Sequence, residues 1–492
     1  MKPEYVVIGA VVLAIVGYLA YQYVLPEHVS VSISLADKAG APVDGTVQLF
    51  ADDKIVAEEN ATAGRASFSV GVRRGSVLSA RATADGFLPG RVGIRKDTAT
   101  ITLQRITKTE PKTDFVIATD AAALDKKYGT EITAEIKSKM LELADAAGTA
   151  EGLRAKTVFI GENYSSLNEA VAKLQPSYLL IVGGTAIVPF VEYDTPLKGA
   201  PGLGFVAMQD PRVPSDNAYG VLPDAAYECN ECYPDVAVGR LPDGNGEKSN
   251  STILVALLDA AISAHRAKPQ LRTMSSLVSR DSFGEHLTHA LYAQLGNNII
   301  DAPPNYLSEA GASDGNETNR LLYMLAALSP ANALFLSVHG SMPPQPQVFA
   351  ASDGSHEYFL MTRGLPPLEN QSFENKIVLA DACYGGNPYR AENESLPMLF
   401  LRNGAAAFLG STTSALANRK VSSQNFDDER EILALGSSTA LHYRVLKGLA
   451  TGERIGDAVK AARREMQHGN AADELTSIQY VLYGDPTLRT SE

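Results

Sequence analysis

Two stretches of the sequence decide the fold: residues 334–341 read LFLSVHGS, and residues 377–386 read IVLADACYGG. Each begins with an almost wholly apolar run and ends in small residues, with His339 in the first stretch and Cys383 in the second. Apolar runs of about four to eight residues are typical of strands that are buried on both faces of a parallel sheet. We therefore predict two neighbouring buried strands, each with one reactive side chain at the point where it leaves the sheet.

A cysteine and a histidine in these positions can act as a nucleophile and its general base. The thiolate is the reactive form of cysteine, and an imidazole can remove the thiol proton. Glycine follows each residue within two positions, which lets a substrate backbone approach and leaves main-chain N–H groups for an oxyanion hole. A lone cysteine is more often a small buried hydrophobe, so the prediction depends on the two residues occurring together at strand ends.

The same alternation of buried strands and longer helical stretches continues through most of the chain after residue 113. It predicts an α/β fold with a mostly parallel sheet and helices on both faces. We divide this region into an N-terminal α/β subdomain at 114–266 and a C-terminal catalytic α/β subdomain at 268–492. The apolar runs that support this division lie at 115–118, 157–160, 178–182, 275–278, 333–338, 377–380 and 405–409.

The N-terminus contains a long apolar stretch. Residues 5–25 carry no charge, and a helix of about 20 apolar residues is enough to cross the hydrocarbon layer. We predict a transmembrane anchor there, with a cleaved signal peptide as the alternative. Lys2 precedes the stretch and no Lys or Arg follows it until Lys38, which predicts a cytoplasmic tip at 1–4 and an extracytoplasmic location for the bulk of the chain.

Between the anchor and the α/β region, residues 29–105 read as short strands separated by turns. Apolar and polar side chains alternate at period two in 29–35 and 66–70, and Asp-Gly turns lie at 44–45 and 85–86. This pattern predicts a small β-sandwich stalk domain, and residues 106–113 have the composition of a linker. Asn-x-Ser/Thr triplets agree with an exterior location and make N-glycans an expected modification. They lie at Asn60, Asn163, Asn250, Asn316, Asn370 and Asn393.

Charge and cysteine content limit the chemistry further. The formal net charge of −13 and the lack of a basic run argue against nucleic acid as a partner. The chain has three cysteines. Cys229 and Cys232 form a close pair, for which a disulfide is favoured, with a metal site or free thiols as alternatives. We expect no cofactor and no catalytic metal, and the sequence does not decide whether a structural calcium ion is bound.

The two decisive stretches resemble the catalytic pair of clan CD cysteine peptidases, which have the caspase-haemoglobinase fold. Further motifs are similar to the gingipain-like branch of that clan, and the resemblance spans roughly residues 114–489. These motifs are LIVGG at 180–184, SDNAYG at 215–220, PDVAVGRLP at 234–242, GAAAFLG at 404–410 and YGDPTL at 483–488.

The resemblance implies a cysteine endopeptidase that cleaves polypeptides, and the apolar N-terminal stretch predicts that it is anchored in a membrane. Cys383 would be the nucleophile and His339 the base, with the N–H groups of Gly340 and Cys383 as the oxyanion hole. Asp381 resembles the pocket acid of relatives that cleave after Arg or Lys, and Asp216 is the second candidate for that role.

Two questions stay open at this point. An acid that orients the imidazole could be Asp210 or Asp194. The same dyad could also transfer the acyl group to an amine, as in transamidase relatives, or the fold could serve as a surface scaffold without catalysis.

Overall fold

The structure is a computed structural model. It describes residues 26–51, 54–73, 76–85, 87, 90–94, 97–103, 113–160, 164–200, 203–221, 234–243, 251–267, 273–278, 300–301, 332–343, 347–352, 357–361, 372–387, 395–416, 437–466 and 470–490. Within these ranges no helix is both long and apolar enough to cross a bilayer. The predicted anchor at 5–25 lies outside them. The described residues up to 103 belong to one compact unit, and those from 113 onward belong to another.

The first unit consists of two sheets that share one apolar core. One sheet has the strand order β4-β1-β7 and the other β3-β2-β5-β6. Alternate side chains, such as Ile33 and Phe68, point into the core and are almost fully buried. This is a β-sandwich. Its strands are β1 (Pro26–Asp37), β2 (Gly45–Ala51), β3 (Lys54–Ala61), β4 (Arg65–Arg73), β5 (Leu78–Thr83), β6 (Gly90–Ile94) and β7 (Thr98–Leu103).

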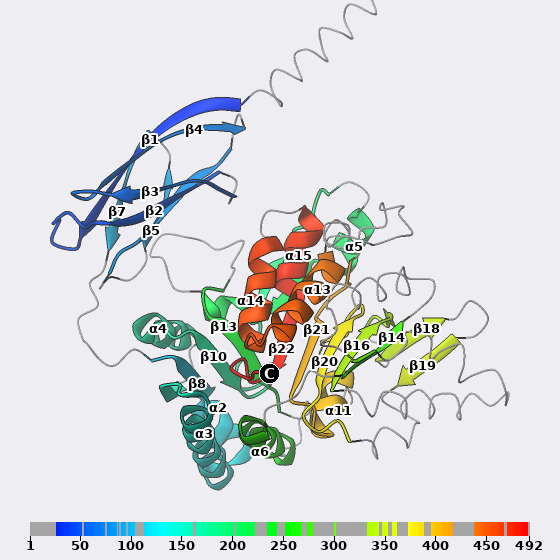
Figure 1. The fold of residues 1–492 in the computed structure, drawn as a ribbon. Helices are drawn as coiled ribbons and strands as arrows, with labels where there is room; N and C mark the ends of the chain where they lie inside the picture. Colours follow the sequence, from blue (N-terminus) through cyan, green and yellow to red (C-terminus); the bar gives the residue numbers. More distant parts are fainter. Residues whose placement is uncertain are drawn as a thin grey trace, which may run out of the picture. The chain divides into compact units, whose positions relative to one another are not determined.

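The second unit is built on one ten-stranded sheet (Figure 1). The strand order is β15-β14-β16-β20-β21-β22-β13-β10-β8-β9, and every neighbouring pair is parallel except β21 and β22. The mostly parallel α/β sheet predicted from the sequence is therefore confirmed. The strands are β8 (Phe115–Asp120), β9 (Ala155–Ile160), β10 (Tyr178–Val182), β13 (Ala237–Leu241), β14 (Thr273–Val278), β15 (Ile300–Asp301), β16 (Ala333–Ser337), β20 (Ile377–Asp381), β21 (Ala407–Ser411) and β22 (Tyr480–Gly484).

The single antiparallel pair divides this sheet into two groups of strands that run in opposite directions. β14, β15, β16, β20 and β21 form one group, and β22 joins the strands of the N-terminal subdomain. β22 pairs with β21 on one side and, through Tyr483 and Arg240, with β13 on the other. The two predicted subdomains thus contribute adjacent halves of one continuous sheet.

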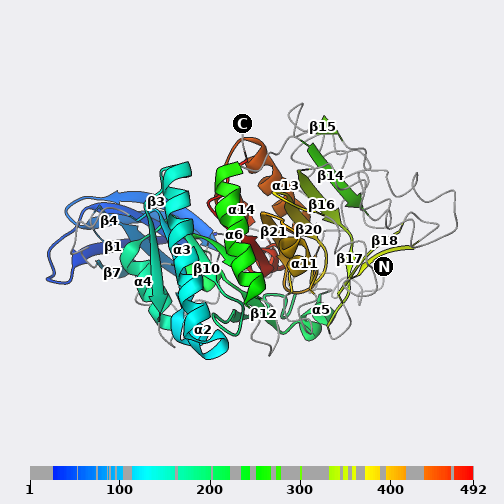
Figure 2. The same cartoon turned by 90° about the horizontal axis from the view of Figure 1, so that it is seen from below.

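Helices cover both faces of the sheet because successive strand residues point to opposite sides. In β16, Leu334 and Leu336 face one apolar cluster, whereas Ala333 and Phe335 face another. Figure 2 shows α2, α3, α6 and α11 on one face, and Figure 1 shows α13, α14 and α15 on the other. The bounds are α2 (Ala121–Tyr128), α3 (Thr130–Glu151), α4 (Tyr164–Leu174), α6 (Thr252–Ala267), α11 (Leu396–Arg402), α13 (Ser437–Ala450), α14 (Ile455–Met466) and α15 (Ala471–Gln479).

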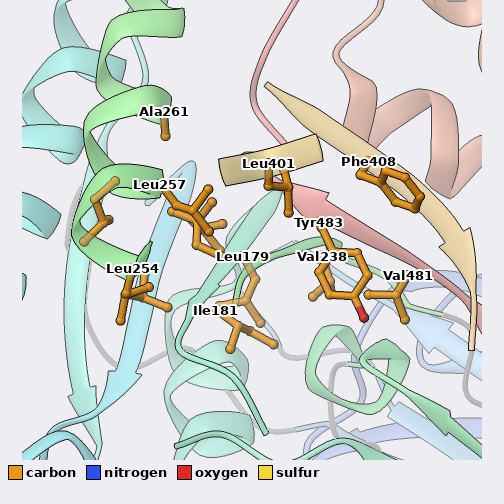
Figure 3. Packing of buried hydrophobic residues seen from close by; sticks show 14 of the residues in the cluster. Leu179, Ile181, Val238, Leu254, Leu257, Ala261, Leu401, Phe408, Val481 and Tyr483 are labelled. Carbon is orange, nitrogen blue, oxygen red and sulfur yellow. The ribbon is translucent and has the colours of Figure 1, made fainter. Parts of the chain in front are cut away.

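The close packing of α6 on the sheet illustrates this core (Figure 3). Leu254 and Leu257 of α6 point towards Leu179 and Ile181 of β10, and all four side chains are buried. At roughly 25 cal/mol per Å² of apolar surface, burying each such side chain contributes about 1.5–3 kcal/mol. The sheet is thus a rigid support for the loops at its edges.

Smaller elements lie in the connections between these strands. β11 (Val191–Asp194) and β12 (Arg212–Ser215) form a hairpin pair, with α5 (Gly204–Gln209) between them and a 3-10 turn at Asn217–Gly220 after them. A second small sheet contains β17 (His339–Gly340), β18 (Val348–Ser352) and β19 (Glu357–Met361). His339 therefore lies in a short paired strand directly after β16.

Candidate active site

The strands that carry the predicted nucleophile and base are neighbours in the sheet. β16 pairs with β20 in parallel, and Ser337 lies opposite Asp381 at the ends of both strands. The N–H of Val338 still donates to the carbonyl of Asp381 at 3.2 Å. Because the register is in phase, His339 and Cys383 each leave the sheet two residues beyond the same paired position.

The backbones of the two loops are in direct contact at Gly340. A Cβ atom at this position would lie 1.8 Å from the carbonyl oxygen of Cys383 and 3.1 Å from its nitrogen. No side chain fits at such a distance, so glycine is required for close approach. This contact brings the main chain that follows His339 against the main chain of the cysteine.

Cys383 is partly buried, while His339 is exposed. Cys383 is a free cysteine, and its Sγ lies 3.6 Å from the carbonyl oxygen of Ala415. Burial raises the pKa of the thiol, the bond to Ala415 opposes that rise, and the carboxylates of Asp381 and Asp210 add to it. The resting thiol is therefore protonated at neutral pH, and it needs a base to become a nucleophile.

The main-chain N–H groups of the loop after Cys383 are hydrogen-bonded within the protein. The N–H groups of residues 384, 385, 386 and 387 donate to the carbonyls of Thr413, Ala382, Ser411 and Tyr384, respectively. Within the described part of the chain, the N–H of Cys383 has no backbone acceptor. The N–H of Cys383 thus differs from the four N–H groups that follow it in the described part of this loop.

Asp381 occupies the end of β20 and is half-buried. Its carboxylate accepts long hydrogen bonds from Thr439 Oγ1 at 3.4 Å and from Tyr480 Oη at 3.3 Å. These partners come from the first turn of α13 and the start of β22. Burial and the nearby Asp381 raise the pKa of the Tyr480 phenol, so this hydroxyl stays protonated and donates.

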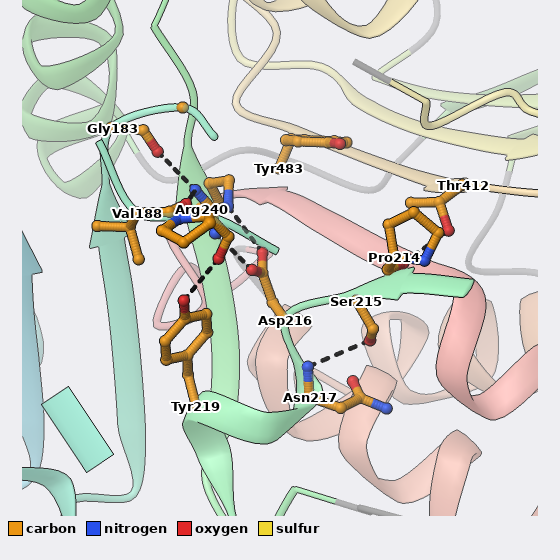
Figure 4. A network of polar contacts seen from close by, with 12 residues as sticks. Gly183, Val188, Pro214, Ser215, Asp216, Asn217, Tyr219, Arg240, Thr412 and Tyr483 are labelled. Carbon is orange, nitrogen blue, oxygen red and sulfur yellow. Dashed lines mark hydrogen bonds and ion pairs between the residues drawn. The ribbon is translucent and has the colours of Figure 1, made fainter. Parts of the chain in front are cut away.

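Asp216 lies in a different environment, shown in Figure 4. Both of its oxygens pair with Arg240, Nε at 2.9 Å and Nη2 at 2.5 Å, and Arg240 Nη1 also donates to the carbonyls of Gly183 and Val188 at 2.7 Å. Arg240 is 1% exposed and Asp216 is 5% exposed. The charge of this carboxylate is therefore already paired with a buried guanidinium of its own chain.

The two acids considered for orienting the imidazole, Asp194 and Asp210, have different surroundings in the structure. Asp194 pairs with Arg212 on the surface hairpin, with its side chain 84% exposed. Asp210 is buried, and it binds the hydroxyl of Tyr384, next to Cys383, at 2.7 Å and the hydroxyl of Ser414 at 2.7 Å. Sequence reasoning gave neither hydroxyl a role: Tyr384 lies within the stretch 377–386, and Ser414 lies outside the recognised motifs.

Some predicted features fall outside the described residues. Cys229 and Cys232 lie there, as do the sequons at 163, 250, 316, 370 and 393. Asn60 lies on β3 with an exposed side chain, whose Oδ1 accepts from Thr46 Oγ1 at 3.1 Å.

A family model for peptidase family C25 matches residues 116–326 and 336–491. The chain belongs to peptidase family C25. This C25 chain is therefore a cysteine-type peptidase, and its substrates are polypeptides. The gingipain-like resemblance noted in the sequence is confirmed.

Solved structures give further comparisons for the C25 chain. The Arg-specific cysteine proteinase gingipain R is 14% identical, with a TM-score of 0.47 over 78% of this chain and 79% of that chain. The complex of RgpB pro- and mature domains from Porphyromonas gingivalis is 15% identical, with a TM-score of 0.45 over 76% and 79%. Dimeric latent PorU from the same organism is 10% identical, with a TM-score of 0.33 over 95% of this chain and 38% of that chain. No curated protein matches the chain.

Proposed function

We propose that this C25 peptidase is an endopeptidase that cleaves after Arg or Lys, with Cys383 as nucleophile and His339 as general base. The observation that carries the proposal is the contact between Gly340 and Cys383, in which a Cβ would lie 1.8 Å from the cysteine carbonyl. Two loops so close at the ends of adjacent strands can present a thiol and an imidazole to one substrate bond.

The proposed reaction has two steps. His339 takes the proton of Cys383 Sγ, and the thiolate attacks the scissile carbonyl carbon while the N–H groups of Gly340 and Cys383 hold the developing oxyanion. The C–N bond breaks, the protonated imidazole gives its proton to the leaving amine, and a thioester is left on Sγ. Water, deprotonated by His339, then hydrolyses the thioester and restores the thiol.

Preference for a basic residue before the cut bond rests on Asp381. Its carboxylate lies two residues before the nucleophile, and Thr439 and Tyr480 hold it through their hydroxyl groups. Within the described part of the chain, these two neutral donors do not compensate its negative charge, and a carboxylate can accept further bonds from a guanidinium or an ammonium group. A substrate Arg or Lys would supply the missing positive charge.

We also propose that the protease acts outside the cytoplasm, attached to a membrane through residues 5–25. Support for this location comes from the uncharged apolar stretch at the N-terminus and the scarcity of basic residues after it. Digestion of this chain by an added protease, compared between intact cells and lysed cells, tests this location. Protection of the α/β region in intact cells would contradict it.

The catalytic assignment is tested with fluorogenic peptides that carry Arg, Lys or Leu before the cleavage site. We expect Cys383→Ala and His339→Ala each to lower kcat/KM for the Arg and Lys peptides by at least about 1,000-fold, because each removes a member of the dyad. His28→Ala, an exposed histidine on β1, is the matched control and keeps wild-type activity. Undiminished cleavage by Cys383→Ala would remove the proposed nucleophile. Product masses with an added amine separate hydrolysis from acyl transfer.

A further inference from the structure

A buried carboxylate joins three distant segments next to the nucleophile. Asp210, at the end of α5, is 7% exposed. Its Oδ1 accepts from Tyr384 Oη at 2.7 Å, and its Oδ2 accepts from Ser414 N–H at 3.1 Å and Ser414 Oγ at 2.7 Å. Ser414 Oγ also lies 3.2 Å from Tyr384 Oη, so the three side chains form a closed triangle.

Tyr384 and Ser414 are each the chain neighbour of a residue at the thiol. Tyr384 follows Cys383 in the chain. Ser414 precedes Ala415, whose carbonyl oxygen lies 3.6 Å from Cys383 Sγ. Asp210 thus connects the segment that carries the sulfur to the segment that accepts its hydrogen bond.

The backbone of Tyr384 needs such support. Its φ angle is 54°, in the left-handed region that bulky residues rarely occupy. The surroundings hold it from several sides: its N–H donates to Thr413 at 2.8 Å, and its carbonyl accepts from Gln347 Nε2 at 2.8 Å. The bond from its hydroxyl to Asp210 fixes the ring and so completes the restraint on the residue next to the sulfur.

We propose that Asp210 is a positioning residue for the Cys383 nucleophile, acting through Tyr384 and Ser414. The proposal rests on the proposed function in one respect, namely that Cys383 is the nucleophile. It gives Asp210 a role in orienting the sulfur and not the imidazole.

The charge of Asp210 makes this role distinguishable from simple structural support. A negative charge near a thiol disfavours the thiolate, and Asp210 contributes in this direction to the raised pKa of Cys383. The other titratable groups that interact with the thiol are Asp381 of β20, Tyr384 of its own loop and Tyr480 of β22. Removing the charge at 210 therefore has two opposite effects: the thiol ionises more easily, while the sulfur loses its orientation.

The test uses three conservative variants of the full chain and one control. Asp210→Asn removes the charge and leaves one acceptor where the triangle needs two. Tyr384→Phe removes only the hydroxyl, and Ser414→Ala keeps the bond from the Ser414 N–H. Asp194→Asn makes the same chemical change as Asp210→Asn at an exposed carboxylate nearby in the chain.

Peptidase kinetics give the first readout. Losing a hydrogen bond to a charged group corresponds to roughly 10-fold to 100-fold in rate. We expect kcat to fall by about that factor in Asp210→Asn and Tyr384→Phe, with KM changed less than about 3-fold, and a smaller fall in Ser414→Ala. The double variant Asp210→Asn/Tyr384→Phe has nearly the kcat of Asp210→Asn alone, because both changes break the same bond. Asp194→Asn matches the wild type.

The second readout needs no substrate. Iodoacetamide alkylation of Cys383, followed by peptide mass spectrometry over a pH series, reports the ionisation of the thiol. The midpoint moves to lower pH in Asp210→Asn, whereas in Tyr384→Phe, which keeps the charge, it does not move downward.

The outcomes separate this proposal from the proposed function. An Asp210→Asn variant whose kcat stays within 2-fold of the wild type, or whose alkylation midpoint matches that of the wild type, overturns the role of Asp210. If the wild-type chain cleaves none of the peptides, the endopeptidase assignment fails, and the alkylation midpoints still decide whether Asp210 acts on the sulfur.

Discussion

Asp381 affects the ionisation of Cys383 and, in our proposal, the choice of substrate. Burial is the largest cause of the raised pKa of the Cys383 thiol, and the carboxylate of Asp381 raises it further. Asp381 is also the acid that we propose for the substrate pocket. These two roles have opposite consequences for the rate, because a charge that attracts a basic substrate also disfavours the thiolate. A bound Arg or Lys would neutralise that charge close to the sulfur.

Replacing this acid separates the two roles. Asp381→Asn lowers the pKa of the thiol, so the alkylation of Cys383 by iodoacetamide begins at lower pH than in the wild type. The same change lowers kcat/KM for Arg peptides by about 10-fold to 100-fold, since a charge-assisted bond is lost, and changes kcat/KM for Leu peptides by less than 3-fold. An equal loss for all three peptides would show that Asp381 does not select the substrate.

Gly340 gives a second test at the residue scale. Gly340→Ala pushes the two catalytic loops apart, because the new Cβ would lie 1.8 Å from the carbonyl oxygen of Cys383. Misplacement by about 1 Å costs on the order of 100-fold in rate, and we expect at least that loss of kcat/KM. Gly93→Ala is the matched control, as nothing lies within 4 Å of a Cβ there. Wild-type activity in Gly340→Ala would contradict the contact.

The sequence was sufficient to find the nucleophile and base as candidates, because each lies where an apolar run ends and glycine follows. The connection of Asp210 to Tyr384 and Ser414 could not be found in this way, although Asp210 was one of two acids considered for the imidazole. Asp210 is 174 positions from Tyr384 and 204 from Ser414, and no local pattern links the three. Their association depends on how the strands are ordered in the sheet.

At the scale of elements, the buried ion pair between Asp216 and Arg240 joins the turn at 217–220 to β13. Both residues occur in motifs that were recognised in the sequence, yet Asp216 was considered for substrate binding and Arg240 was not considered as its partner. Which face of β13 carries Arg240 depends on the register of the strand. That register cannot be read from a continuous run of residues that are buried on both faces.

Breaking this pair tests its structural role. Asp216→Asn leaves the guanidinium of Arg240 buried without its counter-charge, so we expect the free energy of unfolding to fall by about 3–5 kcal/mol. The chain contains no tryptophan, so urea unfolding is followed by far-ultraviolet circular dichroism. Asp194→Asn, which breaks the exposed pair with Arg212, changes the same quantity by less than about 1 kcal/mol. Equal effects of the two variants would contradict the burial of Arg240.

The direction of the strands was the part of the fold that the sequence did not supply. A predicted run such as 405–409 shows that a buried strand exists and says nothing of its orientation, and the strand at 480–484 was not among the predicted runs. The structure shows that β22 runs antiparallel to β21 while remaining parallel to β13. The reversal lies between β21 and β22, and the parallel pairing of β22 with β13, more than 200 residues earlier in the chain, joins the two halves of the sheet.

At the scale of the whole molecule, the described residues form two units with separate apolar cores. The sandwich core draws its buried residues from 31–103, and the two clusters of the α/β unit draw theirs from 115–488. We expect two unfolding transitions in urea, with one assignable to a chain that begins at residue 113. A peptide inhibitor with a basic residue that alkylates Cys383 shifts the α/β transition alone, since ligands stabilise the unit that binds them. One cooperative transition for the full chain would contradict this independence.

The central place of β22 in the sheet has a consequence for biosynthesis. This strand lies between β21 and β13, yet Tyr480 is translated 97 residues after Cys383. At roughly 5–20 residues per second, the ribosome adds it roughly 5–20 s later. During that interval the nascent polypeptide has both members of the proposed dyad but lacks the strand that joins the two halves of the sheet. The site that we propose is therefore not supported by a complete sheet until β22 has been added.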